Sequence, residues 1–368
     1  MPLDVLDRWH MARALELAAQ GRGHVEPNPL VGAVVAHGAE VIGDGWHHRY
    51  GGPHAEVEAL AVAGVHARDA TLYVTLEPCC HHGKTPPCTD AVIAAGIRRV
   101  VIAHRDPFPA VDGGGIGRLE AAGLEVVVGV EAESARRLNA PYLKLVTQAR
   151  PWLIAKWAMT LDGKIATHSG DSRWISSPAS RAVVHELRGR VDAIIVGRHT
   201  ARLDDPLLTA RPPGPRTPLR IVLDTRATLA DDSKLVRTAA EVPVLVVAGP
   251  QALLADRERL TSAGCEVLVC DAETHQGRIN QLLDELGRRR MTNVLVEGGA
   301  TLLGALFDSG QIDEVHTFIA PRLVGGAVAP SPLAGHGHER MSAAGRVRVE
   351  SCEQIGDDVY LRGIVERD

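Results

Sequence analysis

The sequence predicts an α/β protein that is built from two consecutive domains. Its 368 residues are enough for two domains of ordinary size, and a hydrophobic content of 45% is normal for globular cores. Strand-like apolar runs alternate with helical stretches in both halves, which is the pattern of an α/β fold. The dipeptide Arg150-Pro151 marks the end of the first series. We therefore expect domains over residues 1–148 and 149–368.

Composition and charge argue against several classes of protein. The net charge of -5 argues against a nucleic-acid binder, which would carry a basic stripe. No apolar run reaches the length of a membrane span, and acidic residues near the N-terminus argue against a signal peptide. Six cysteines in a chain of this length fit a reducing compartment better than a disulfide framework. We therefore expect a cytoplasmic protein.

The first domain is expected to begin with an amphipathic helix over residues 4–20. Pro27-Asn28-Pro29 then leads into a buried strand that ends near residue 35. Asn28 lies between two prolines at the start of this strand, where its side chain could form hydrogen bonds with the edge of a heterocycle. The alternative is that Asn28 only forms a turn. Further strands are expected at 41–45, 71–75, 99–103 and 125–128, and further helices from 54 and over 89–95, 115–122 and 131–145.

The second domain is expected to start a new α/β unit directly after the boundary. Strands are expected at 152–158, 193–196, 219–223, 242–247, 266–269 and 294–296. The last of these leads through Glu297-Gly298-Gly299 into a helix. Glycine backbone at a helix N-terminus suits a nucleotide phosphate, and simple packing of the helix against the strand is an equal alternative. Asp204-Asp205 is either a carboxylate pair or, more commonly, an N-cap before a turn.

The most informative motif joins His54-Ala55-Glu56 to Pro78-Cys79 and Cys88. One imidazole and two thiolates can hold a zinc ion and leave its fourth position open for water, whose pKa zinc lowers to roughly 7. Glu56 can reach that water without being a ligand and can transfer protons. This combination is typical of a zinc deaminase, although the usual pattern is Pro-Cys-x-x-Cys and the second thiol lies further away here.

A closed structural zinc site is the alternative, with Cys80, His81 or His82 as a fourth protein ligand. A closed site leaves Glu56 without a role, so the catalytic interpretation is preferred. Cys80 is expected to be a packed thiol, because adjacent side chains rarely point the same way. The remaining cysteines stand in apolar runs and are expected to be buried small hydrophobes: Cys265, Cys270 and Cys352.

Taken together, these motifs resemble one family, the bifunctional deaminase/reductase of riboflavin biosynthesis, over nearly the whole chain. The matching motifs are Pro27-Asn28-Pro29, His54-Ala55-Glu56, Glu77-Pro78-Cys79 to Cys88, Leu161-Asp162-Gly163-Lys164, Ser172-Arg173-Trp174-Ile175, Asp204-Asp205-Pro206 and Val296-Glu297-Gly298-Gly299. The resemblance implies a cytidine-deaminase-like three-layer fold for the first domain and a dihydrofolate-reductase-like α/β fold for the second.

The resemblance also implies two consecutive reactions. The first is hydrolytic deamination of 2,5-diamino-6-(5-phosphoribosylamino)pyrimidin-4(3H)-one. The second is NADPH-dependent reduction of the ribosyl chain of 5-amino-6-(5-phosphoribosylamino)uracil to ribityl. One zinc ion per chain is implied, with His54, Cys79 and Cys88 as ligands and Glu56 as the proton carrier.

Further site residues follow from the resemblance. Contacts to the deaminase substrate are implied for Asn28, His47 and Lys84. Contacts to the reductase substrate are implied for Ser172, Arg188, Leu208, Arg211 and Glu297. Contacts to NADPH are implied for Ala158, Trp174, Thr200, Asp204, Thr225, Gly299, Ala300, Thr301, Leu302, Leu303, Gly304 and Ala305.

Some of these roles also make physical sense. Arg188 and Arg211 can clamp a phosphate, and Trp174 offers a flat face to a nicotinamide ring. Glu297 and Lys156 are both candidates for protonating the developing amine during reduction.

Two other functions compete with this interpretation. A tRNA-editing or nucleoside-type zinc deaminase with an unrelated C-terminal domain is disfavoured, because the basic stripe is missing and the second domain is large. A zinc-stabilised binding protein without activity would not need Glu56. We expect small-molecule substrates, no nucleic-acid or membrane partner, and a homo-oligomer, either a dimer or a tetramer.

Overall fold

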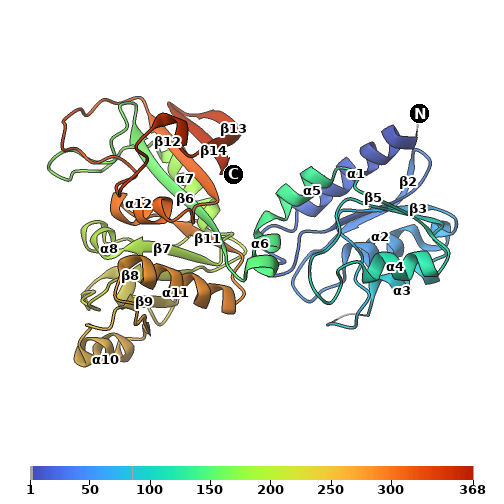
Figure 1. Ribbon diagram of the computed structural model, residues 1–368, viewed down its shortest axis with the longest axis horizontal. Helices are drawn as coiled ribbons and strands as arrows, with labels where there is room; N and C mark the ends of the chain where they lie inside the picture. Colours follow the sequence, from blue (N-terminus) through green and yellow to red (C-terminus); the bar gives the residue numbers. More distant parts are fainter. Residues whose placement is uncertain (1–2, 85, 368) are drawn as a thin grey trace. The chain divides into compact units, whose positions relative to one another are not determined.

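The structure is a computed structural model that describes residues 3–84 and 86–367. It divides into two compact units, Met1–Ala149 and Arg150–Asp368, which are described separately (Figure 1). Among the described residues, no helix is long and apolar enough to cross a membrane.

A five-stranded sheet forms the centre of the first unit, in the order β2-β1-β3-β4-β5. Its strands are β1 Gly32–His37, β2 Glu40–Trp46, β3 Thr71–Val74, β4 Arg99–Ile102 and β5 Glu125–Val128. Strand β1 pairs antiparallel with β2 and with β3, whereas β3, β4 and β5 run parallel. The start of β1 and the ends of β2, β3 and β4 therefore meet at one edge of the sheet.

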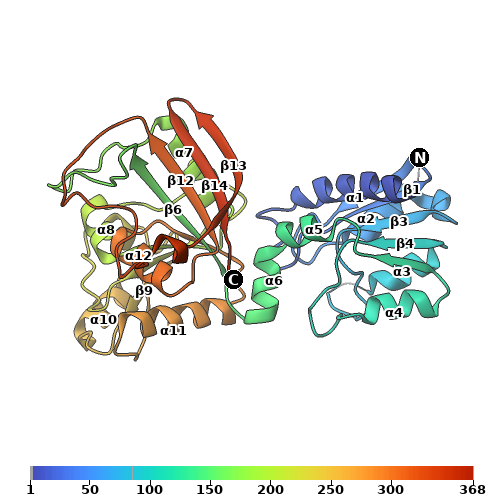
Figure 2. The same cartoon turned by 45° about the horizontal axis from the view of Figure 1, so that its top comes forward.

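Helices cover both faces of this sheet and give three layers. The helices are α1 Leu3–Ala19, α2 Ala55–Ala63, α3 Cys88–Ala94, α4 Gly114–Ala121, α5 Ala132–Leu138 and α6 Ala140–Gln148, with a short 3-10 helix at Gly64–Ala67. One apolar core joins one sheet face to α2, α3 and α4, and the other joins the opposite face to α1 and α5. Figure 2 shows α1 and α5 on one side of the sheet and α3 and α4 on the other.

The single helix that was predicted over residues 131–145 is wrong, because the chain forms two helices there, α5 and α6. Asn139 stands between them, buried, with its backbone outside the helical region. Its side-chain oxygen accepts the Leu30 backbone N–H at 2.8 Å, and its amide donates to the Leu30 carbonyl at 2.8 Å. Pro141 occupies the first turn of α6, where its missing N–H costs nothing. A long-range contact thus ends the first helix.

A nine-stranded sheet forms the centre of the second unit, in the order β10-β9-β8-β7-β11-β6-β12-β14-β13. Its strands are β6 Trp152–Thr160, β7 Ala193–Gly197, β8 Leu219–Leu223, β9 Val244–Ala248, β10 Glu266–Val269, β11 Asn293–Val296, β12 Glu314–Ala320, β13 Val347–Ile355 and β14 Asp358–Val365. The strands from β10 to β12 are parallel, and β14 and β13 are antiparallel additions.

Helices also cover both faces of the second sheet. They are α7 Pro178–Arg188, α8 Arg198–Asp204, α9 Lys234–Arg237, α10 Leu254–Ser262, α11 His275–Arg288 and α12 Ala300–Asp308, with a 3-10 turn at Met341–Ala343. Apolar residues of α11 and α12 pack on one face of the sheet, and those of α8, α9 and α10 pack on the other. Because the central strands are parallel, the loops after β6, β7 and β11 open at the same edge, where open α/β sheets bind ligands.

The end of the chain holds elements that the sequence did not predict. Strands β12, β13 and β14 complete the sheet with an antiparallel hairpin. Cys352 lies on the outer strand β13 and is exposed, so its prediction as a buried hydrophobe is wrong, whereas Cys265 and Cys270 are buried. The predicted N-cap role of Asp204-Asp205 is also wrong. Asp204 ends α8, and Asp205 follows as its left-handed C-cap, with φ of 39°.

Candidate active sites

Three potential metal ligands meet at the edge of the first sheet. His54 is the N-cap of α2, Cys79 lies in the loop after β3, and Cys88 is the first residue of α3. One donor atom from each residue lies within 4.8 Å of the others. The His54 Nδ1 atom is 3.1 Å from the Cys88 Sγ atom and 3.5 Å from the Cys79 Sγ atom. Among the described residues, Cys80 and its neighbouring histidines are not part of this group.

The chemistry of this group fits zinc, which binds nitrogen and sulfur donors in tetrahedral sites and leaves one position open in catalytic ones. The Cys88 backbone N–H, at the start of α3, donates to the Cys79 Sγ atom at 3.3 Å. Hydrogen bonds from the Cys88 thiol and from His54 lower the pKa of Cys79. This favours the thiolate, the form that binds metal.

Glu56 lies in the first turn of α2, two residues after His54, and its side chain is buried. Its Oε2 atom has no hydrogen-bond partner. Burial raises the pKa of this carboxyl above its usual value. A buried carboxylate oxygen without a partner is costly unless a ligand or a bound water completes its hydrogen bonds.

Asn28 and His47 form a second polar pair at the same edge. The His47 Nδ1 atom lies 2.8 Å from the Pro53 carbonyl, which can only accept, so Nδ1 carries the proton. The Nε2 atom of His47 is then an acceptor, and the Asn28 amide donates to it at 3.2 Å. Burial lowers the pKa of His47, which keeps the ring neutral. The His47 and His54 rings pack edge to face, with their centroids 5.3 Å apart.

The predicted substrate residue Lys84 contacts an aromatic ring. The Lys84 ammonium lies 3.9 Å from the centroid of the Tyr50 ring, in a cation–π contact. Phe108 lies next to His81, with ring centroids 6.1 Å apart. Cys80 is half-buried, and its thiol donates to the Ala110 carbonyl at 3.8 Å, in keeping with a packed thiol.

Glu77 anchors the loop that carries Cys79, and sequence reasoning gave it no role. Its buried carboxylate accepts four backbone N–H groups, from Asp106, Gly113, Gly115 and Ile116, at 3.0–3.2 Å. A Cβ atom at Gly115 would lie 2.1 Å from the Pro78 carbonyl oxygen, so only glycine allows this approach. The position of Glu77 next to Pro78-Cys79 was the only indication in the sequence that it has a role. Its hydrogen-bond partners could not be predicted, because they lie about one helix and one strand further along the chain.

Two adjoining cavities open at the carboxyl edge of the second sheet. The first, of about 490 Å³, is lined by residues that follow β7 and β11, including Thr200 and Gly299. The second, of about 520 Å³, is lined by Trp174, His185 and Arg211. The residues that line both cavities are Lys156, Ala158, Ser172, Arg188, Asp204 and Pro206. This shared wall is where two bound molecules would meet.

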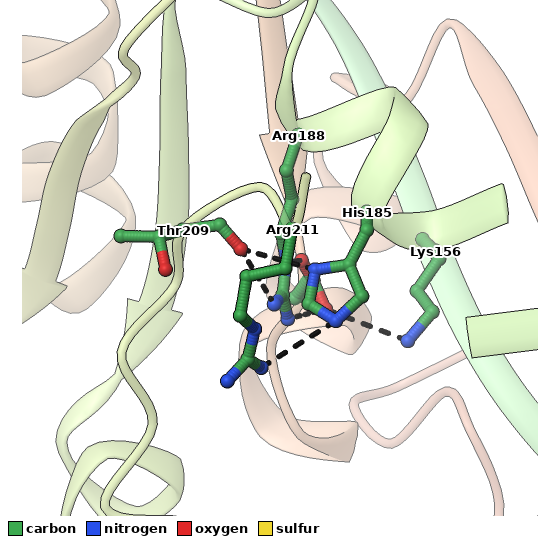
Figure 3. Close-up of polar contacts among 6 residues, drawn as sticks. Lys156, His185, Arg188, Thr209 and Arg211 are labelled. Atoms are coloured by element: carbon green, nitrogen blue, oxygen red, sulfur yellow. Dashed lines mark hydrogen bonds and ion pairs between the residues drawn. The ribbon is translucent and has the colours of Figure 1, made fainter. Parts of the chain in front are cut away.

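A buried ion network stands at this wall (Figure 3). The Arg188 guanidinium holds the Glu297 carboxylate through two hydrogen bonds, of 2.6 and 2.9 Å, and the Lys156 ammonium lies 3.4 Å from the same carboxylate. The Glu297 side chain is 8% exposed and that of Arg188 is 13% exposed. Although burial opposes it, the charges of Arg188 and Lys156 lower the pKa of Glu297 to about 2.

This network changes the expected phosphate clamp. Arg188 is bound to Glu297, so its charge is balanced by a carboxylate. Arg211 is exposed and lines the second cavity, and among the described residues it forms no ion pair with a carboxylate. Of the two arginines predicted to clamp the phosphate, only Arg211 therefore has a positive charge that no described carboxylate balances. Arg188 would have to break its contact with Glu297 before it could bind the phosphate.

Comparison with known proteins gives two family matches. Residues 151–361 match the RibD C-terminal domain, and residues 5–104 match the cytidine and deoxycytidylate deaminase zinc-binding region. The chain is 41% identical to the riboflavin biosynthesis protein RibD of Actinobacillus pleuropneumoniae, over 98% of this chain and 95% of that protein. It is 38% identical to the RibD of Escherichia coli, over 96% of this chain and 98% of that protein.

The chain belongs to the RibD family. Its structure is also similar over its whole length to solved RibD structures. RibD of Acinetobacter baumannii superposes with a TM-score of 0.86 at 35% identity, covering 99% of this chain and 100% of that one. A Thermotoga maritima protein, described as a diaminohydroxyphosphoribosylaminopyrimidine deaminase/5-amino-6-(5-phosphoribosylamino)uracil reductase, superposes with a TM-score of 0.83 at 34% identity, covering 98% and 99%.

RibD membership confirms the predicted family, the two-part α/β fold class and the class of enzyme, a bifunctional deaminase and reductase of riboflavin biosynthesis. A nucleic-acid deaminase with an unrelated second domain is not supported, because the second half matches the RibD reductase domain.

Within this RibD fold, most of the predicted cofactor residues line one of the two cavities. Those in the first cavity are Ala158, Thr200, Asp204, Gly299, Ala300, Thr301 and Leu302. Trp174 lines the second, where the Arg181 guanidinium lies 4.4 Å from its ring centroid. Leu303 is buried in the core, and a Cβ atom at Gly304 would lie 1.9 Å from the Ala334 carbonyl oxygen. The residues that line neither cavity are Thr225, Leu303, Gly304 and Ala305.

Proposed function

We propose that residues 1–148 deaminate 2,5-diamino-6-(5-phosphoribosylamino)pyrimidin-4(3H)-one. We also propose that residues 149–368 reduce the resulting 5-amino-6-(5-phosphoribosylamino)uracil with NADPH. The Thermotoga maritima relative carries the names of both reactions, and this chain covers nearly all of it. The observation that carries the deaminase assignment is the buried Glu56 carboxylate, whose Oε2 atom has no partner, beside three clustered candidate metal donors.

In the proposed deaminase site His54, Cys79 and Cys88 hold one zinc ion. When bound, zinc supplies a water of lowered pKa as the nucleophile. Glu56, whose pKa is raised by burial, takes a proton from the attacking water at Oε2 and passes it to the leaving amine. The Asn28 amide and the neutral His47 ring orient the pyrimidine.

In the proposed reductase site NADPH occupies the first cavity, with its phosphates at Gly299 and the N-terminus of α12, and supplies the hydride. The phosphoribosyl substrate occupies the second cavity, with its phosphate at Arg211. Lys156, held by Glu297 at the wall between the cavities, is positioned to donate a proton to the developing amine. Ser172 lines both cavities and is placed for the predicted substrate contact, whereas Leu208 lines only the first cavity.

We further propose that NADPH is preferred over NADH. Arg198, Arg202 and Arg226 lie near the predicted cofactor positions in sequence, and each can meet a 2′-phosphate. Reduction rates measured with both cofactors at several concentrations test this preference, and equal catalytic efficiencies would contradict it.

The decisive experiment supplies each proposed substrate separately. With the diamino compound, the protein should release ammonia without needing NADPH. With the uracil compound, it should oxidise NADPH and release no ammonia. A preparation that deaminates nucleosides or retains RNA instead would contradict the assignment.

Two further proposals concern the setting of the enzyme. We propose a cytoplasmic location, which the six free cysteines support. We also propose a homo-oligomer, either a dimer or a tetramer, which sedimentation of the purified protein would test.

A further inference from the structure

His185 stands at the second cavity and has no role in the reaction as described so far. It lies on α7, one turn before Arg188, and lines the cavity together with Arg211. Figure 3 shows one nitrogen of its ring joined to the Thr209 carbonyl and the other joined to the Arg211 guanidinium. The Nδ1 atom lies 3.1 Å from the Thr209 oxygen, and the Nε2 atom lies 3.4 Å from the Arg211 Nη2 atom.

These two contacts allow only one protonation state of the ring. A carbonyl oxygen only accepts hydrogen bonds, so Nδ1 must carry a proton toward Thr209. A guanidinium only donates, so Nε2 must offer a lone pair to Arg211. His185 is therefore neutral in this arrangement. Burial, together with the charge of Arg188, lowers its pKa and favours the same state.

A neutral acceptor suits a guanidinium that has to bind an anion. Glu297 orients Arg188 but also cancels its charge. His185 can orient Arg211 through its lone pair and leave the positive charge free for a ligand. The Thr209 carbonyl also accepts a hydrogen bond from the Arg188 Nη1 atom, at 3.4 Å. Thr209 therefore links both His185 and Arg188 to the chain segment that carries Arg211. An arginine side chain that is aimed in advance loses less entropy when its ligand binds.

We propose that His185 is a positioning residue of the reductase site, which as a neutral imidazole aims Arg211 at the phosphate of the substrate. The inference rests on the proposed function, in which Arg211 binds that phosphate. It assigns to His185 an effect on substrate affinity rather than on hydride transfer.

Two substitutions at His185 separate this role from a structural one. His185→Gln keeps an acceptor near the position of Nε2, whereas His185→Phe keeps a flat ring and loses the acceptor. With 5-amino-6-(5-phosphoribosylamino)uracil and NADPH, we expect His185→Phe to raise KM by about tenfold, a typical size for coupling between residues in contact. We expect kcat to change less than KM, and His185→Gln to restore most of the lost affinity.

A double-mutant cycle with Arg211→Ala completes the test. Arg211→Ala should raise KM by itself, and His185→Phe should then add little, because the group it positions is gone. Thermal unfolding of the same preparations reports whether the mutated unit is folded, and ammonia release reports whether the first unit is intact.

The outcomes separate the inference from the proposal beneath it. If Arg211→Ala leaves KM unchanged, the proposed phosphate contact is wrong. If Arg211→Ala raises KM but His185→Phe does not, or if the two effects simply multiply, the positioning role of His185 is wrong. Equal KM values for the Phe and Gln variants would likewise refute the requirement for an acceptor.

Discussion

The buried ion network of the second unit makes a sharp prediction about Glu297→Gln. The substitution keeps the shape of the side chain and removes the charge that Arg188 and Lys156 share. Both cations have side chains less than one fifth exposed, at 13% and 18%, so water compensates for the lost carboxylate less than it would at the surface. Removing one partner of a buried ion pair costs about 3–5 kcal/mol. For a domain of this size, the midpoint of thermal unfolding should fall by about 6–20 °C.

The acid dependence of stability tests the same network in a second way. The pKa of Glu297 is about 2 in the folded protein, below the unfolded value of about 4.3. A lowered pKa stabilises the folded state above the unfolded value, and this contribution disappears as the pH falls toward 2. The difference corresponds to on the order of 3 kcal/mol, which agrees with the range for a buried pair. The stability gap between the unchanged protein and Glu297→Gln should therefore shrink below about pH 4.5.

The assay is differential scanning calorimetry at neutral pH and along a series toward acid, with ammonia release as a check that the first unit is intact. Glu266→Gln is the matched control. Its carboxylate pairs with Arg289 in the same unit, but its side chain is 49% exposed, and such surface pairs contribute only about 0–1 kcal/mol. If Glu297→Gln lowers the unfolding midpoint no more than Glu266→Gln, the argument from burial is refuted.

Three further predictions concern the first unit. Cys79→Ser should lower zinc content and abolish ammonia release, whereas the exposed Cys352→Ser should do neither; full deamination by a metal-stripped preparation would contradict the metal assignment. Glu56→Gln should slow ammonia release by about 10²–10⁴-fold and leave reduction of supplied uracil substrate nearly unchanged, and loss of both activities would refute two separate sites. Glu77→Gln should weaken zinc binding by about 10–100-fold in a chelator competition, because an amide N–H then faces backbone donors; unchanged affinity would show that Glu77 does not support the ligand loop.

Part of this fold was predictable because its signals are local. Apolar runs predicted the strands from β1 to β11. Such a run marks a buried strand by its own residues, without information on which strands it pairs with. The outer strand β13 was not predicted, because most of its residues are exposed and polar residues interrupt its apolar ones. The end of α5 at Asn139 was also not predicted. The hydrogen bonds that hold Asn139 outside the helix go to Leu30, which is distant in the sequence.

The sites divide in the same way. The sequence alone determined the donor types and spacings, His54 with Glu56 and Cys79 with Cys88, because a metal site selects residue types that stand out in any context. Only the tertiary structure decided how further residues are placed around them. The antiparallel pairing of β1 with β2 and β3 brings Asn28 and His47 to the same edge as the metal donors.

The second unit shows why partners cannot be read from spacing. Arg188 and Arg211 have the same side chain, and the sequence offers no reason to treat them differently. In the fold, one is bound to a buried carboxylate and the other rests on a neutral imidazole. That difference arises because α7, the segment after α8 and the end of β11 converge at one sheet edge, and the charge that each arginine retains depends on which groups this packing places beside it.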